Sequence, residues 1–246
     1  MNENIKIKIL KAVIRTLVKP MFGPPCSVPV QRTWLNAMSA VSLLPKSTHT
    51  QNVNMDGMAA ELVSNGFTNA DSKNVILYLH GGAYCIGSAK THRSLTSNLA
   101  KKATAKVYVP DYRLAPEHTF PAAIDDCLQA YEFLLGQGVD PQDIIIAGDS
   151  AGAGLVMATA LRIKQKKLIQ PSGLVLISPW VDLTLSNAAH IKDKIDPLLS
   201  WSSLKAGTKH YLQGHDTQDP LASAIFADLS GLPPMLIQVG TEEILL

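Results

Sequence analysis

The sequence has few of the residues that would indicate a disulfide framework or a metal site. Its three cysteines, Cys26, Cys85 and Cys127, are odd in number and far apart. Neither paired disulfides nor the close spacing of zinc ligands is therefore expected. We interpret the cysteines as buried thiols of a protein in a reducing cytosol, and we predict cytoplasmic localisation and no metal.

An excess of one charge and a long apolar run are also lacking. The 22 basic and 20 acidic side chains give a net charge of +2, so nothing indicates a nucleic-acid partner. No apolar run approaches the ~18 residues that span a bilayer, and we expect no stable membrane insertion. A chain of 246 residues is long enough for one domain with a large core.

The N-terminal segment is basic and amphipathic. Apolar pairs recur at helical spacing between residues 9 and 18, among lysines and arginines. Such a helix could lie on a membrane surface, but packing of its apolar stripe on the rest of the protein is commoner, and we predict that packing. Prolines end this helix, and residues 30–44 form a second, weaker helical pattern. We assign residues 1–50 to a helical cap segment.

From residue 51 onward, short apolar runs alternate with helical stretches. The pattern predicts strands over 58–63, 75–79, 106–109, 144–147, 174–178 and 235–239, and helices over 94–102, 122–135, 155–166 and, irregularly, 186–212. This alternation predicts an α/β fold with a mostly parallel sheet and helices on both faces. Residues 51–246 would then be one catalytic domain with a cap insertion at about 183–215.

The motif that organises the chain is Gly148-Asp149-Ser150-Ala151-Gly152. A G-x-S-x-G pentapeptide is weak evidence alone, since both residue types are common. Here an apolar strand enters it and a helix of small residues leaves it, which is the context of a nucleophile elbow. Ser150 is therefore the candidate nucleophile.

A second motif, beginning His80-Gly81-Gly82, follows the strand over 75–79. It could be an ordinary glycine-rich turn. Acyl transfer, however, needs N–H donors for the developing oxyanion, and the loop follows a strand whose carboxyl end is expected near the elbow. We predict Gly81, Gly82 and Ala151 as the donors.

Together, His80-Gly81-Gly82-Ala83-Tyr84, the segments 111–117 and 120–123, and the Ser150 motif resemble the hormone-sensitive lipase family of α/β-hydrolases. The resemblance implies an α/β-hydrolase fold, a helical cap, no cofactor, and a serine carboxylesterase acting on short to medium acyl esters. It also implies supporting positions for His80 and Asp149. The charged segment from Arg113 to Glu117 is predicted to fix a loop by ion pairing, and His92 and His118 to lie outside the reacting centre.

The triad acid is expected after the strand over 235–239, because this fold places its catalytic residues in the order serine, acid, histidine. The resemblance implies Glu243 as the acid, while spacing alone leaves Glu242 open. Asp196 and Asp219 each begin an Asp-Pro-Leu sequence that mimics the acid motif. Both precede the strand, and we discount them.

The triad histidine is missing after Glu243, and so is the further strand that the family places before it. His190, His210 and His215 precede the acid and are weak substitutes. Two alternatives to an ester hydrolase stay open: a non-catalytic protein that binds small molecules, or an inactive fragment. The strand over 235–239 would also present an unpaired edge, which makes a homo-oligomer possible.

Overall fold

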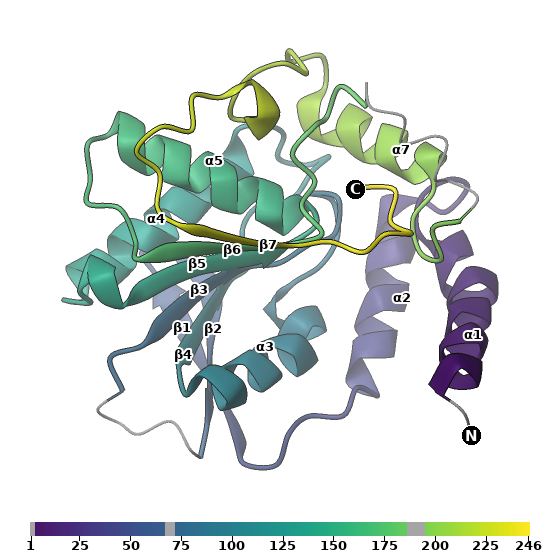
Figure 1. Cartoon of the computed structure of the whole chain (residues 1–246), viewed down its shortest axis with the longest axis horizontal. Helices are drawn as coiled ribbons and strands as arrows, with labels where there is room; N and C mark the ends of the chain where they lie inside the picture. The colour runs from purple at the N-terminus through teal and green to yellow at the C-terminus, as the bar shows by residue number, and fades with distance from the viewer. Residues whose placement is uncertain (1–2, 67–71, 186–194) are drawn as a thin grey trace.

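A computed structural model describes residues 3–66, 72–185 and 195–246, and it contains one seven-stranded sheet (Figure 1). Its strand order is β1-β2-β4-β3-β5-β6-β7. Strand β2 pairs antiparallel with both β1 and β4, and the other neighbouring strands pair in parallel. The strands are β1 (Thr48–Met55), β2 (Met58–Asn65), β3 (Val75–Leu79), β4 (Lys106–Pro110), β5 (Ile144–Asp149), β6 (Gly173–Ile177) and β7 (Met235–Gln238).

Helices cover both faces of the sheet, as the alternating pattern predicted. In Figure 1, α4 (Ala122–Gly136) and α5 (Ala151–Gln165) lie on one face, and α3 (Ala89–Ala103) lies on the other. The predicted α/β fold with a mostly parallel sheet is therefore confirmed. The other helices are α1 (Glu3–Val13), α2 (Val28–Ala40), α7 (Trp201–Leu212), a π-helical turn (Ile14–Val18) and 3₁₀ turns at Lys19–Met21, Pro141–Asp143 and Ala224–Phe226.

The core is divided by the sheet, because successive side chains of a strand point to opposite faces. Along β3, Val75, Leu77 and Leu79 join the larger cluster that includes side chains of α4 and α5. Ile76 and Tyr78 join a smaller cluster with side chains of α3. All five are buried, which explains why this strand is a continuous apolar run.

The order of the strands places the functional loops together. The chain passes from β3 to β4 on one side and returns to β5 on the other. At such a switch in strand order the two neighbouring loops diverge and leave a crevice at the carboxyl ends. The loops after β3 and β5 carry His80-Gly81-Gly82 and Ser150.

Two boundaries differ from the sequence-based prediction. The sheet begins at Thr48, so β1 starts inside the segment assigned to residues 1–50. The first part of the irregular helical region, residues 186–194, lies outside the described residues, and α7 begins at Trp201.

The prediction that the N-terminal helix packs its apolar stripe against the protein holds only in part. Ile9, Leu10, Val13 and Leu17 are between 43% and 66% exposed, whereas Ile14 and Val18 are partly buried. Polar groups also join the segment to the rest of the chain, with Lys11 Nζ 2.7 Å from Glu242 Oε2 and Lys19 Nζ 3.0 Å from the Asp196 carbonyl oxygen. Helical periodicity alone could not tell which face would be covered.

Three expectations about thiols, metals and membranes can be compared with the structure. Cys85 and Cys127 are buried free thiols, whereas Cys26 is only partly buried, which corrects the prediction for that residue. Within residues 3–66, 72–185 and 195–246, no cluster of three metal-ligating side chains occurs. Over the same residues, none of the helices combines the length and apolar character needed to cross a bilayer.

Candidate active site

Ser150 occupies a strained turn between β5 and α5. Its φ of 51° and ψ of −120° lie in a region that non-glycine residues rarely adopt, at a cost of about 1–3 kcal/mol. Two backbone hydrogen bonds hold the turn: the Ser150 N–H donates to Ile177 O at 2.9 Å, and the Trp180 N–H donates to Ser150 O at 3.0 Å. The predicted elbow is therefore present, supported from β6 and the loop after it.

The two glycines of the elbow are required by close backbone contacts. A Cβ atom on Gly152 would lie 2.0 Å from Leu79 O, and one on Gly148 would lie 2.7 Å from the same oxygen. Real Cβ atoms do not approach backbone so closely. The G-x-S-x-G pattern thus reflects how tightly α5 packs against the end of β3.

The loop after β3 lies beside the elbow, but one predicted donor is already used. The Gly81 N–H donates to Asp149 Oδ1 at 2.9 Å, so Gly81 is not available to an oxyanion and that part of the prediction is wrong. Among the described residues, the N–H groups of Gly82, Ala83 and Ala151 have no recorded acceptor. Ala83 has a φ of 52°, a feature that sequence alone did not reveal.

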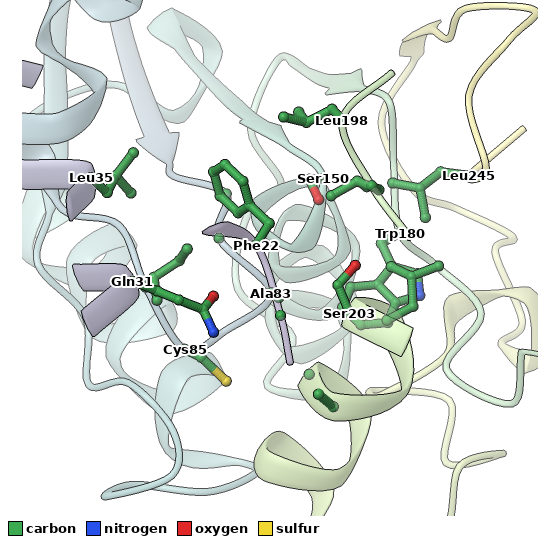
Figure 2. A pocket seen from close by; sticks show the side chains of 18 of the residues that line it. Phe22, Gln31, Leu35, Ala83, Cys85, Ser150, Trp180, Leu198, Ser203 and Leu245 are labelled. Carbon is green, nitrogen blue, oxygen red and sulfur yellow. The ribbon is translucent and has the colours of Figure 1, made fainter. Parts of the chain in front are cut away.

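A cavity of about 590 Å³ opens over Ser150 (Figure 2). Its walls come from the N-terminal segment, which supplies Phe22 and Leu35, from the loops after β3, β5 and β6, from the residues between Asp196 and His210, and from the segment after β7. In Figure 2 the Ser150 hydroxyl points into this space, among Phe22, Leu198, Trp180 and Leu245. Gly82, Ala83 and Glu243 also border it, whereas Ala151 is fully buried beneath.

The structure separates the two candidate acids. Glu243 borders the cavity, and its Oε1 accepts the Gly240 N–H at 2.9 Å. Glu242 is exposed and pairs with Lys11. Of the two, Glu243 is therefore the one whose side chain borders the cavity.

The two discounted aspartates have structural roles. Asp196 is buried, and its carboxylate accepts the N–H groups of Leu198, Leu199 and Ile244 at 2.7–2.8 Å. It therefore ties the segment before α7 to the loop that carries Glu243. Asp219 accepts the N–H of Leu221 in its own turn.

A family model described as the alpha/beta hydrolase fold matches residues 76–246. The chain belongs to the α/β-hydrolase fold family. An esterase of Acinetobacter venetianus is 43% identical over 241 residues, which are 97% of this chain and 77% of that protein. The putative acetyl-hydrolase LipR of Mycobacterium tuberculosis is 33% identical, over 98% of this chain and 77% of its own length.

Solved structures agree with these relatives. A crystal structure of EstE5 soaked with p-nitrophenyl butyrate has a TM-score of 0.90 and 39% identity, covering 98% of this chain and 80% of that one. An esterase of the bacterial hormone-sensitive lipase family has a TM-score of 0.91 and 35% identity, covering 100% and 81%. The prediction of a hormone-sensitive-lipase-type esterase, a carboxylic ester hydrolase, is confirmed.

The histidines of this α/β-hydrolase do not complete a triad among the described residues. No described histidine hydrogen-bonds to Ser150 or Glu243. His210 borders the cavity, His215 packs its ring 5.4 Å from that of Phe120, and His190 lies outside the described residues. The base is therefore not assigned.

His92 lies outside the reacting centre, as expected, and its charged partner is Asp149. It borders the cavity beside Ser150, and its Nε2 is 3.6 Å from Asp149 Oδ1. Its position depends on α3 packing across the sheet, which no local pattern encodes. His118, in contrast, is exposed, as expected.

His80 supports the loop from a buried position. Its Nδ1 is 2.9 Å from Gly81 O, Tyr112 Oη donates to His80 O at 2.6 Å, and the two rings stack with centroids 4.2 Å apart. Burial, reinforced by the charge of His92, lowers the pKa of His80 to about 3. His80 is therefore neutral and fixes the loop.

The charged segment after β4 fixes its loop by ion pairing, with partners on other elements. Arg113 pairs with Asp126 of α4 at 2.7 Å. Glu117 accepts two hydrogen bonds from Arg32 of α2, at 2.8 and 2.7 Å. The second pair attaches the N-terminal segment to the α/β-hydrolase sheet domain.

Proposed function

We propose that the cavity binds short to medium acyl esters and that Ser150 attacks their carbonyl carbon. The observation that carries this proposal is the strained elbow, whose hydroxyl has no hydrogen-bond partner among the described residues and faces a partly open cavity. A protein that only binds a ligand has no need of backbone strain at this point. Gly82, Ala83 and Ala151 would donate to the oxyanion.

Glu243 is proposed as the acid that orients a histidine base, in the order of this fold. Its carboxylate borders the cavity and is held by Gly240. We infer that residues 1–50 and about 183–215 form the cap, because cavity walls come from both. The limited volume and the names of relatives, an acetyl-hydrolase and an ethyl acetate hydrolase, support short acyl groups.

Two further parts of the proposal concern the setting of the protein. The three free thiols favour a reducing compartment, and we propose the cytoplasm. The edge position of β7 favours a homo-oligomer.

The test compares wild type with Ser150→Ala in hydrolysis of p-nitrophenyl acetate, butyrate and dodecanoate. We expect turnover that falls with chain length, and a loss of at least about 10³-fold in the variant. A fluorophosphonate probe should label Ser150. Ser27→Ala is the matched control, since Ser27 borders the same cavity and should keep full labelling.

The outcomes separate the alternatives. Labelling of Ser150 with negligible turnover would show a nucleophile pocket without a working base. Ligand binding with neither labelling nor turnover would indicate the non-catalytic binding protein. Equal hydrolysis by wild type and Ser150→Ala would contradict the assignment of the nucleophile.

A further inference from the structure

The carboxylate of Asp149, directly before the nucleophile, is the centre of a partly buried network. Asp149 Oδ1 accepts the Tyr78 hydroxyl at 2.7 Å and the Gly81 N–H at 2.9 Å, and His92 Nε2 lies 3.6 Å from the same oxygen. Its partners come from β3, the loop after it and α3. One oxygen thus connects the elbow, the loop carrying the oxyanion donors and a helix.

His92 has an acceptor near each ring nitrogen. Its Nδ1 is 3.0 Å from Thr91 Oγ1 and 3.3 Å from Ser88 O, and Nε2 faces Asp149. The Thr91 hydroxyl donates its own proton to Ser88 O at 2.9 Å, so it faces Nδ1 as an acceptor. A neutral imidazole has one N–H, whereas an imidazolium has two. Only the protonated ring can donate to both acceptors.

The charges around His92 agree with that state. Burial alone would lower the pKa of His92, but the hydrogen bond and charge of Asp149 and the carbonyl of Ser88 outweigh burial and raise it. The pKa of the Asp149 carboxyl shifts in the opposite direction. Burial alone would raise it, but the interactions with His92, Tyr78 and the Gly81 N–H outweigh burial and lower it below its usual value.

The other titratable neighbours of His92 are His80 and Tyr78, with ring centroids 5.3 and 6.4 Å from that of His92. Both are uncharged near neutral pH, since burial lowers the pKa of His80 and raises that of Tyr78.

We propose that His92 is a positioning residue of the esterase site: as an imidazolium it holds Asp149 in the orientation that captures the Gly81 N–H, and so fixes the oxyanion loop beside Ser150. This inference rests on the proposed function of the loop as an oxyanion site. The contacts among His92, Asp149 and Gly81 do not depend on that function. His92 acts through Asp149 and Gly81.

The fit between Asp149 and Gly81 makes the loop sensitive to this pair. A Cβ on Gly81 would lie 2.2 Å from Asp149 Oδ2, so the carboxylate packs directly against the loop backbone. Gly81 immediately precedes Gly82 and Ala83, the proposed donors. A shift of about 1 Å in such groups costs up to 10²-fold in rate.

The experiment measures the His92 titration and the Gly81 amide by NMR in the full chain, and ester hydrolysis beside them. In wild type, the pKa of His92 should lie above 6.5, and Asp149→Asn should lower it to that value or below. His92→Gln should reduce the hydrogen-exchange protection of the Gly81 amide by at least about 10-fold. It should also lower kcat by about 10- to 100-fold with KM nearly unchanged. His49→Gln, on exposed β1, is the control and should change none of these.

A wild-type His92 that titrates at or below 6.5 would overturn the proposal, and this measurement needs no variant to fold. Unchanged Gly81 protection in a folded His92→Gln protein would overturn it as well. If the chain neither hydrolyses esters nor reacts with the fluorophosphonate, the proposed function fails, while the two NMR results still decide the role of His92.

Discussion

At the scale of single residues, the site depends on backbone contacts that only glycine permits. Gly152 of α5 passes Leu79 O so closely that any Cβ would collide with it. The sequence pattern therefore anticipated the elbow for a physical reason. The pattern could not show that the Gly81 N–H donates a hydrogen bond within the protein, because its acceptor is the side chain of Asp149, at the end of the neighbouring strand β5.

Gly152→Ala should destabilise the fold by about 2–5 kcal/mol, because a Cβ 2.0 Å from Leu79 O must push backbone apart. Gly136→Ala is the control, since its Cβ would meet nothing within 4 Å at the end of α4. It should be neutral or stabilising by up to about 1 kcal/mol. Chemical denaturation measures both, and similar losses in the two variants would contradict the close-contact argument.

His80 should make the protein sensitive to acid. Its folded-state pKa of about 3 lies below the unfolded value of 6.5, so the unfolded state binds the proton first. The contribution of His80 to stability is then lost as pH falls below 6.5, by about 1.4 kcal/mol per pH unit until the folded-state pKa is reached. Urea unfolding of wild type and His80→Asn between pH 7 and 4.5 should show a shallower pH slope in the variant, and parallel slopes would refute this.

At the scale of elements, sequence patterns predicted the strands with apolar runs and missed the one that is mostly polar. The strand β1, Thr48–Met55, is mostly polar and largely exposed at the sheet edge, and it exists through its pairing with β2. The central strands β3 and β5 are continuous apolar runs and were anticipated. Tertiary pairing therefore supplied what local pattern could not.

The attachment of α2 to the sheet domain should depend more on Arg32 than on Glu117. Arg32 donates to the carbonyl oxygens of Cys85 and Ala115 at 2.8 and 2.9 Å, in addition to the exposed carboxylate. Arg32→Met should cost about 1–3 kcal/mol by leaving these carbonyls unpaired, whereas Glu117→Gln should cost less than about 1 kcal/mol. Thermal unfolding of both variants tests this, and an equal effect would mean that the ion pair alone matters.

At the scale of the whole molecule, β7 is the outermost of the described strands at one side of the sheet. The strand pairs with β6 on one side only, and Leu236 and Ile237 are 63% and 58% exposed. An unpaired edge with apolar side chains is a template for another strand, because its free N–H and C=O groups can continue the ladder. The opposite edge, β1, exposes mainly polar side chains and offers less apolar surface to bury.

We therefore predict concentration-dependent self-association through β7. Ile237→Lys places a charge on the exposed strand, a device by which natural edge strands avoid pairing, and should shift the protein toward monomer in sedimentation velocity. Gln51→Lys, at an exposed position of β1 on the other edge of the sheet, is the control and should leave association unchanged. The catalytic loops lie at the carboxyl ends of β3 and β5, so fluorophosphonate labelling should be the same in wild type and Ile237→Lys. A wild-type chain that sediments as a monomer at all concentrations would show that the short β7 edge is insufficient to recruit a second sheet.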